Sequence, residues 1–356
     1  MKLPAIQPAT KLSKGPKRLY ISGYGFEDRA TGWMSFQEKQ GKILTESLIV
    51  NYLPPKGENR ITEVRKALRK IGIDFPNEWE FDITEPGEIE ERIKKKIGSV
   101  DKYDEIILDI SSLTKFLILI FLCVLSKYKG FLRIVYTEAN DYPPSKSQYV
   151  NLKIDPTLIQ HFPTQGFGTI LRAKCLSSIR MQGQPVCLIA FTSFNEQLIK
   201  YMLGTINPYR LIILNGKPPR SDLRWREKAT YEIHKKLMDA YKKTNPINSD
   251  TGLPQIRVDT LRYHETFNTI EKIYREHCNY ERIIVAATGS KMQTVGLFFN
   301  KIAHPDIHIE YPTPDSHLFP GAPKGIKYVH EIEIPHFATY LKNLHSESHI
   351  SMIGQI

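Results

Sequence analysis

The chain has 356 residues, of which 41% are hydrophobic and 24% are charged, and this ordinary composition excludes a largely disordered or collagen-like chain. Its length suits one large domain or two medium-sized domains with a substantial core. The 49 lysines and arginines exceed the 38 aspartates and glutamates, and the net charge of +11 favours anionic partners such as nucleotides or nucleic acid.

The cysteines and the apolar runs indicate the cellular compartment of the protein. Cys123, Cys175, Cys187 and Cys278 are far apart and form no Cys-x-x-Cys pair, which is typical of buried thiols in a reducing cytoplasm. The N-terminus lacks the apolar core of a signal peptide. The apolar run 116–125 is shorter than the roughly 20 residues that span a bilayer, so it predicts a helix buried on all sides. We expect a cytoplasmic protein with no membrane role.

The first half of the chain alternates strand-like and helical patterns, which is typical of a parallel sheet covered on both faces. Residues 1–17 predict a loose lead-in. The strands that we expect next are residues 18–22, 48–53, 79–83, 106–110, 133–137 and 149–154, with helices near 60–71, 88–97 and 116–125.

The second half repeats this order. Residues 157–184 change character and predict a connector, after which strands are expected at 187–191, 211–215, 256–259, 283–287 and 307–311. Tyr328, Val329 and Pro335 match Tyr149, Val150 and Pro156 in order and spacing. Six matched elements predict an internal duplication of an α/β, Rossmann-like unit. The expected domains are a first unit at 18–156, a second at 185–335, and a helix and tail at 336–356.

Residues 283–293 carry the clearest functional signal. An apolar strand is followed by Thr288, Gly289, Ser290 and Lys291, and then by a helical pattern. Glycine allows close approach, the amides at a helix start favour negative charge, and the hydroxyls and the lysine add donors. An ordinary turn before a helix has the same residue types, so the hypothesis of an anion site gains weight only from the repeat.

Two such units arranged as a pseudo-dimer would bring both sets of strand ends to a shared cleft. The loops at the carboxyl ends of the strands supply the candidate ligand-binding residues, which are Ser22, Gly23, Tyr24, Gly25, Glu27, Arg29, Asp109, Ser111, Ser112, Thr114, Lys115, Glu138, Tyr142, Thr192, Ser193, Phe194, Asn195, Thr288, Gly289, Ser290 and Lys291. Asp109 and Glu138 would repel phosphates. Asp109 equally suits a helix or turn cap, and Glu27 equally suits an ion pair with Arg29.

The run from Asp109 to Lys115 resembles a motif of the CARF domains, which are ligand-sensing modules of type III CRISPR accessory proteins. That motif is Asp/Asn-x-Ser/Thr-x-x-x-Lys/Arg, and Asp109, Ser111 and Lys115 fit it. In the second unit Ala286 replaces the acid, and Lys291 stands one place early. Two units in one chain also resemble the SAVED domain of CBASS anti-phage effectors. The resemblance implies a cyclic oligonucleotide bound between the units and a role in prokaryotic defence.

Three functions are consistent with these patterns. The first is a sensor that binds a nucleotide messenger and signals to a separate effector, because residues 1–17 and 336–356 are too short to form one. The second is a metal-independent ring nuclease, in which a ribose 2′-hydroxyl attacks the adjacent phosphate. Its candidate catalytic residues are Lys115, Lys291, Ser111 and Ser290.

The third function is a nucleic-acid-binding or scaffold subunit, with Arg220, Arg224 and Arg226 as candidate contacts. Other chemistries lack support in the sequence. It contains no Walker A sequence and no Gly-x-Ser-x-Gly elbow. His345 and His349 lie one helical turn apart, but no third metal ligand is evident. We expect neither a metal nor a cofactor.

Overall fold

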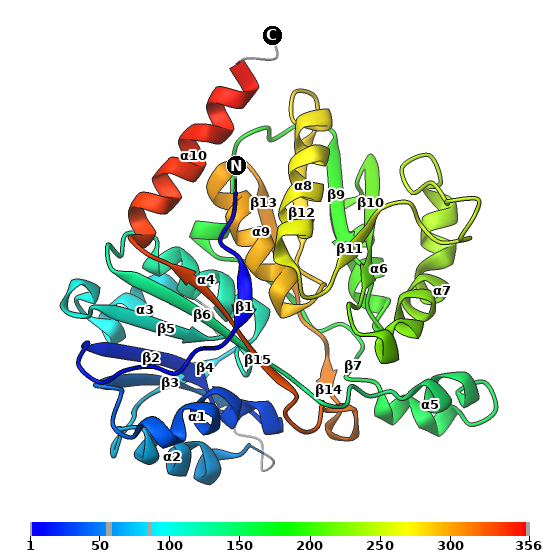
Figure 1. Ribbon diagram of the computed structural model, residues 1–356. Coiled ribbons are helices and arrows are strands. Elements are labelled where there is room, and N and C mark those ends of the chain that lie inside the picture. The colour runs from blue at the N-terminus through cyan, green and yellow to red at the C-terminus, as the bar shows by residue number, and fades with distance from the viewer. Residues whose placement is uncertain (1, 55–58, 84–86, 354–356) are drawn as a thin grey trace. The chain divides into compact units, whose positions relative to one another are not determined.

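The computed structural model describes residues 2–54, 59–83 and 87–353, and the chain divides into two compact α/β units (Figure 1). The first unit combines Met1–Tyr142 with Ala322–Glu347, and the second combines Pro143–Gly321 with Ser348–Ile356.

The first unit is built on a seven-stranded sheet in the order β1-β15-β6-β5-β2-β3-β4. The strands are β1 (Ile6–Pro8), β2 (Arg18–Gly23), β3 (Glu46–Leu53), β4 (Asn77–Asp82), β5 (Glu105–Asp109), β6 (Phe131–Glu138) and β15 (Tyr328–Ile334). The strands β2 to β6 are parallel, whereas β15 is antiparallel to β6 and β1 is antiparallel to β15.

Helices cover both faces of this sheet. They are α1 (Gly32–Gln37), α2 (Ile61–Lys70), α3 (Ile89–Ile97) and α4 (Lys115–Leu125), and α10 (Phe337–Ile353) follows β15. Trp33 of α1 and Leu68 of α2 share a buried cluster with Tyr20, whose ring stacks on Trp33. In α4 every residue from Phe116 to Leu122 is buried, which confirms the prediction of a helix enclosed on all sides. Each such apolar side chain contributes about 1.5–3 kcal/mol by burial.

The second unit is built on a six-stranded sheet in the order β11-β10-β9-β12-β13-β8. Its strands are β8 (Ile170–Leu171), β9 (Val186–Phe191), β10 (Arg210–Lys217), β11 (Arg257–Asp259), β12 (Arg282–Ala286) and β13 (His308–Pro312). Its helices are α5 (Lys146–Asn151), α6 (Gln197–Ile206), α7 (Trp225–Ala240), α8 (Tyr263–His277) and α9 (Lys291–Ala303). A separate ribbon pairs β7 (Thr164–Gln165) with β14 (Ser316–His317).

The two sheets have the same topology. Counted along the chain, the parallel strands of each unit lie in the order 3-2-1-4-5, as β4-β3-β2-β5-β6 and as β11-β10-β9-β12-β13. An antiparallel strand then borders the fifth strand, β15 in the first sheet and β8 in the second. The shared order supports the duplication of a Rossmann-like unit.

The predicted strand at 149–154 is wrong, and the predicted domain boundaries change with it. Ser145 and Gln148 form a capping box that starts helix α5. The position beside β6 is taken by β15, which the duplication had assigned to the second unit. Residues 143–156 therefore belong to the second unit, and residues 322–335 belong to the first.

The lead-in and the connector also contribute to the sheets. Within residues 1–17, β1 pairs with β15, and the side chains of Leu3 and Leu12 are buried. The backbone N–H and the hydroxyl of Thr10 both donate to the Glu331 carboxylate. The connector supplies β8, the edge strand of the second sheet. The expected C-terminal helix is present as α10.

Candidate functional site

The loops that follow the fourth parallel strand of each unit place a lysine at the same point. Lys115 is the first residue of α4, and Lys291 is the first residue of α9. The preceding residues, Thr114 and Ser290, cap these helices through their hydroxyls. Thr114 Oγ1 accepts from the N–H of Leu117 at 3.3 Å, and Ser290 Oγ accepts from the N–H of Gln293 at 3.0 Å. Each lysine thus lies beside the positive end of a helix dipole.

In each unit, a hydroxyl three residues before the lysine clamps the end of the first parallel strand, which means that it forms hydrogen bonds with both the N–H and the carbonyl of the last strand residue. Ser112 Oγ donates to the Gly23 carbonyl at 2.7 Å and accepts from the Gly23 N–H at 3.2 Å. Thr288 Oγ1 donates to the Phe191 carbonyl at 2.8 Å and accepts from the Phe191 N–H at 2.9 Å. Gly23 ends β2 and Phe191 ends β9. The same hydrogen-bond pair therefore recurs in both units.

These contacts correct the alignment of the two loops. Ser112, Thr114 and Lys115 correspond to Thr288, Ser290 and Lys291, and the members of each pair are equally far apart in the sequence. Lys291 is therefore not early. The first loop has one additional residue, Ser111, whose Oγ accepts from the N–H of Thr137 at 2.8 Å.

The environment of Lys115 changes its charge state. The side chain is only partly exposed, and burial among protein atoms lowers the pKa of Lys115 from its ordinary 10.5 to about 8. Lys115 therefore carries most of its charge at neutral pH but loses it at a lower pH than an exposed lysine does. Lys291 is also partly exposed.

Two of the three predicted acidic residues, Asp109 and Glu138, are buried and have partners within the fold. Asp109 is fully buried, and its carboxylate accepts from Tyr20 Oη at 2.8 Å and from the N–H of Ser111 at 2.9 Å. It therefore caps a turn, the structural alternative expected for it. Glu138 is also buried, with its Oε2 atom 3.1 Å from His330 Nε2. Both carboxylates therefore have partners within the protein.

The two serines proposed as catalytic residues are both used by the fold. Ser111 is completely buried behind the loop. Ser290 Oγ donates to the Thr260 carbonyl at 2.6 Å while it accepts from Gln293. Of the four candidate catalytic residues, the two serines thus have hydroxyl contacts within the fold, and Lys115 and Lys291 are both partly exposed.

The loop after β2 is held together by its own polar side chains. Tyr24 is buried, and its hydroxyl bonds Glu78 at 2.5 Å, so its ring belongs to the core of the unit. Glu27 and Arg29 form the ion pair expected from the sequence. Arg29 also donates to Tyr136 Oη at 3.1 Å, and the Tyr136 hydroxyl is 3.3 Å from that of Tyr142.

Further predicted residues of the first unit border the same loop. Gly25 accepts from the N–H of Arg60 at 3.0 Å through its carbonyl. Ser22 is buried, and its hydroxyl lies 3.1 Å from that of Ser112. Gly25 and Ser22 are therefore held by contacts within the first unit.

The loop after β9 has a similar internal network. Thr192 Oγ1 donates to Asn215 Oδ1 at 3.1 Å, and Asn195 Nδ2 donates to the Gly166 carbonyl at 2.9 Å. The N–H of Ser193 donates to His234 Nε2 at 3.2 Å. Burial lowers the pKa of His234 to about 4, which keeps the imidazole neutral and able to accept this bond. His234 was not predicted, because it lies within a helix without a local motif.

The aromatic and basic candidates near α7 do not form one basic surface. The Arg226 guanidinium lies 4.4 Å from the centre of the Phe194 ring and donates to the carbonyls of Pro143 and Pro144. Arg220 pairs with Asp222 at 2.5 Å. Arg224 is exposed. Two of the three arginines predicted to contact nucleic acid therefore have structural partners.

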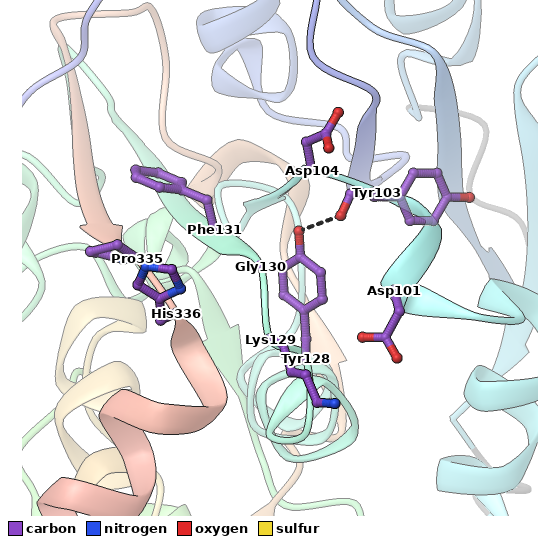
Figure 2. Close-up of a pocket in the computed structure, with 9 residues that line it drawn as sticks. All are labelled: Asp101, Tyr103, Asp104, Tyr128, Lys129, Gly130, Phe131, Pro335 and His336. Carbon is purple, nitrogen blue, oxygen red and sulfur yellow. Dashed lines mark hydrogen bonds between the residues drawn. The ribbon is translucent and has the colours of Figure 1, made fainter.

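A cavity of about 600 Å³ lies at the amino ends of β5 and β6 in the first unit (Figure 2). It is lined by Asp101, Tyr103, Asp104, Tyr128, Lys129, Gly130, Phe131, Pro335 and His336. The Tyr128 hydroxyl donates to the Tyr103 carbonyl at 3.0 Å, as the dashed line in the figure shows. None of the predicted ligand residues borders this cavity, and its two aspartates suit an anion poorly.

Within the part of the chain that the structure describes, no group of three histidine, cysteine, aspartate or glutamate side chains is placed to hold a metal ion. No helix in the same part has the length and apolarity needed to cross a membrane.

Comparisons with known proteins identify no family. No protein-family model matches the chain, and no curated protein does. Among solved structures, the chain has a weak likeness to a putative universal stress protein from Pseudomonas aeruginosa UCBPP-PA14. The two are 7% identical, the match covers 94% of this chain and 98% of that one, and the TM-score is 0.22. A score this low carries no argument about function.

Proposed function

We propose that the protein binds an anionic nucleotide, of the cyclic or oligomeric class, at the carboxyl ends of its parallel strands, and that the bound state is recognised by a separate effector. The observation that carries this proposal is the repeated lysine. Each unit holds Lys115 or Lys291 at the first position of a helix, supported by a clamped loop. An arrangement of lysine, helix cap and hydrogen-bonded loop that recurs in both units is expected of a ligand site.

The chemistry of this edge suits phosphate. A lysine at a helix start combines a full positive charge with the positive end of the helix dipole, and both attract phosphate oxygens. The net charge of +11 adds a general attraction for polyanions.

The resemblance to CARF and SAVED domains supplies the ligand class and the biological setting of the proposal. It points to a cyclic oligonucleotide second messenger in prokaryotic anti-phage defence. In such a system the sensor is cytoplasmic and the effector is another protein. The ligand class is the part that can be tested directly.

The test is native mass spectrometry of the protein with cyclic di-, tri-, tetra- and hexanucleotides, followed by titration calorimetry of any that bind. Lys115→Met and Lys291→Met should each weaken binding by about tenfold or more, because each removes a charge-assisted contact. Lys235→Met is the matched control, since Lys235 is exposed on α7. If no nucleotide binds, or if both lysine variants bind like the control, the proposal is wrong.

One observation favours a second function, that of a ring nuclease. A lysine whose pKa is about 8 can donate a proton near neutral pH more readily than an ordinary lysine can. Attack of a ribose 2′-oxygen on the adjacent phosphorus would break the bond to the 5′-oxygen, which takes up a proton and leaves a linear product with a 2′,3′-cyclic phosphate. Loss of bound cyclic mass and appearance of this product over hours would identify the enzyme. Binding of long RNA or DNA instead would favour the scaffold function.

A further inference from the structure

Tyr52 joins the two sides of the loop that carries Lys115. This tyrosine lies near the carboxyl end of β3, a strand that neither begins nor ends the loop. Its hydroxyl accepts from the N–H of Thr114 at 3.0 Å and donates to the carbonyl of Ser112 at 3.3 Å. Ser112 is the residue that clamps β2, and Thr114 is the residue that caps α4. A single phenol therefore links both anchors of the loop.

The tyrosine ring is held in a defined place. It packs edge-on against Phe81 of β4, with ring centres 6.2 Å apart. It also lies against the backbone of Gly23, where an added methyl group would come within 3.2 Å of the ring. Contacts with β4 and with the end of β2 thus restrict the direction in which the hydroxyl points.

The second unit satisfies the corresponding amide in a different way. The N–H of Ser290, which corresponds to Thr114, donates to Gln293 Oε1 at 2.7 Å within a capping box. In the first unit the residue three places after the cap is Leu117, which has no oxygen to offer. Tyr52 therefore accepts the hydrogen bond of the Thr114 amide from a neighbouring strand, whereas Gln293 accepts that of the Ser290 amide from within the same helix.

We infer that Tyr52 is a positioning residue for Lys115, so that the anion site of the first unit is held by a neighbouring strand while that of the second is held locally. The inference rests on the proposed function for its effect on binding. Removal of the hydroxyl leaves the Thr114 amide without this acceptor and releases the Ser112 carbonyl from its donor. The loop then loses its hydrogen bonds to β3, and the Lys115 side chain becomes more mobile and more hydrated.

Tyr52→Phe tests this inference, because it removes one oxygen and keeps the ring. The first readout is nucleotide affinity, which should fall about five- to tenfold, the effect of losing one or two ordinary hydrogen bonds. The second needs no ligand. It is the pKa of Lys115, followed by NMR of the protein with ¹³C-methylated lysines and assigned through the signal missing from Lys115→Met. This pKa should rise from about 8 towards 10.5 as the amine becomes hydrated.

Two further variants show whether the effect is specific. Tyr209→Phe alters a tyrosine that is 71% exposed, and it should change neither readout. Gln293→Leu removes the local cap of the second unit, and it should leave the pKa of Lys115 unchanged. Circular dichroism at the assay temperature establishes that each variant is folded.

The outcomes separate this inference from the proposed function. If the wild-type protein binds no nucleotide, the proposed function fails, but the lysine titration still decides the role of Tyr52. If Tyr52→Phe leaves the pKa of Lys115 unchanged, the positioning role is overturned, whatever the protein binds. If the wild type binds and the variant binds equally well, Tyr52 does not determine the specificity or strength of this site.

Discussion

At the scale of single residues, the charge of Lys115 links its burial to the stability of the fold. In the unfolded chain this lysine keeps its proton up to a pKa of about 10.5, whereas in the folded protein it loses the proton at about 8. Between these two values the unfolded state binds more protons, so the free energy of unfolding rises with pH. Burial of the charged Lys115 side chain therefore lowers the free energy of unfolding at neutral pH. Such a cost is expected of a lysine whose charge serves ligand binding.

Lys115→Met should remove this pH dependence. Wild-type stability should increase relative to that of the variant as the pH is raised from 8 towards 10.5, because only the wild type has this group to deprotonate. Urea unfolding of both proteins near the two ends of this window measures the difference. Lys235→Met, which alters an exposed lysine of α7, should keep the wild-type behaviour. A difference between wild type and Lys115→Met that stays constant across the window would contradict the assigned burial of Lys115.

At the scale of secondary-structure elements, the hydroxyl clamps hold the first and fourth parallel strands of each unit in register. In the second unit Thr288 satisfies both backbone groups of Phe191, which is itself buried. Thr288→Val keeps the shape of the side chain but leaves these groups without their partner. It should lower the free energy of unfolding by about 1–3 kcal/mol, the cost of an unsatisfied buried polar group.

Chemical denaturation of Thr288→Val measures this cost. Ser147→Ala is a suitable control, because Ser147 is exposed on α5 and surface substitutions usually change stability by less than about 0.5 kcal/mol. The clamp is wrongly assigned if the two variants are equally stable. The same experiment separates a structural hydroxyl from a ligand donor, since a ligand donor could be removed without loss of stability.

The parallel strands were predictable because they are buried on both faces. Runs such as 106–108 and 283–287 are continuously apolar, and a helical pattern follows each of them. The edge strands carry no such signal. β1 and β8 are short, and of their residues only Leu171 is buried. The alternation over 149–154 resembles a strand, but the capping box at Ser145 favours a helix, and Val150 and Ile154 are exposed.

The candidate site was predictable in part for a similar reason. Lys115 and Lys291 were found because a strand, a small-residue loop and a helix are adjacent in the sequence. The correspondence between Ser112 and Thr288 was missed, since the extra Ser111 shifts the alignment and only the contacts with Gly23 and Phe191 reveal it. Tyr52 had no local signal, because its hydroxyl acts on a loop far away in the sequence.

At the scale of the whole molecule, the repeat is not a simple sequence of two finished domains. All strands of the second sheet lie within residues 143–321, whereas the first sheet takes β15 from beyond that segment. Arg133 of β6 is buried and pairs with Glu331 at 2.8 Å and Glu333 at 2.5 Å, both on β15. The first unit therefore takes from beyond residue 321 the strand that joins β1 to β6, and two of the three carboxylates that pair with Arg133, the third being Glu105 of β5.

This dependence predicts different behaviour for two fragments. Residues 143–321 contain every strand of the second sheet, so this fragment should unfold cooperatively by itself. Residues 1–142 lack β15, which leaves the backbone of β6 unpaired on that side and removes Glu331 and Glu333 from Arg133. This fragment should therefore aggregate and show no cooperative transition. Addition of a peptide covering residues 322–347 should restore a cooperative transition, measured by circular dichroism during urea unfolding. A peptide with Glu331→Gln and Glu333→Gln should restore it less well, because it supplies the strand but not the charges. If residues 1–142 alone unfold as cooperatively as the complemented fragment, β15 is dispensable and the first unit is complete without it.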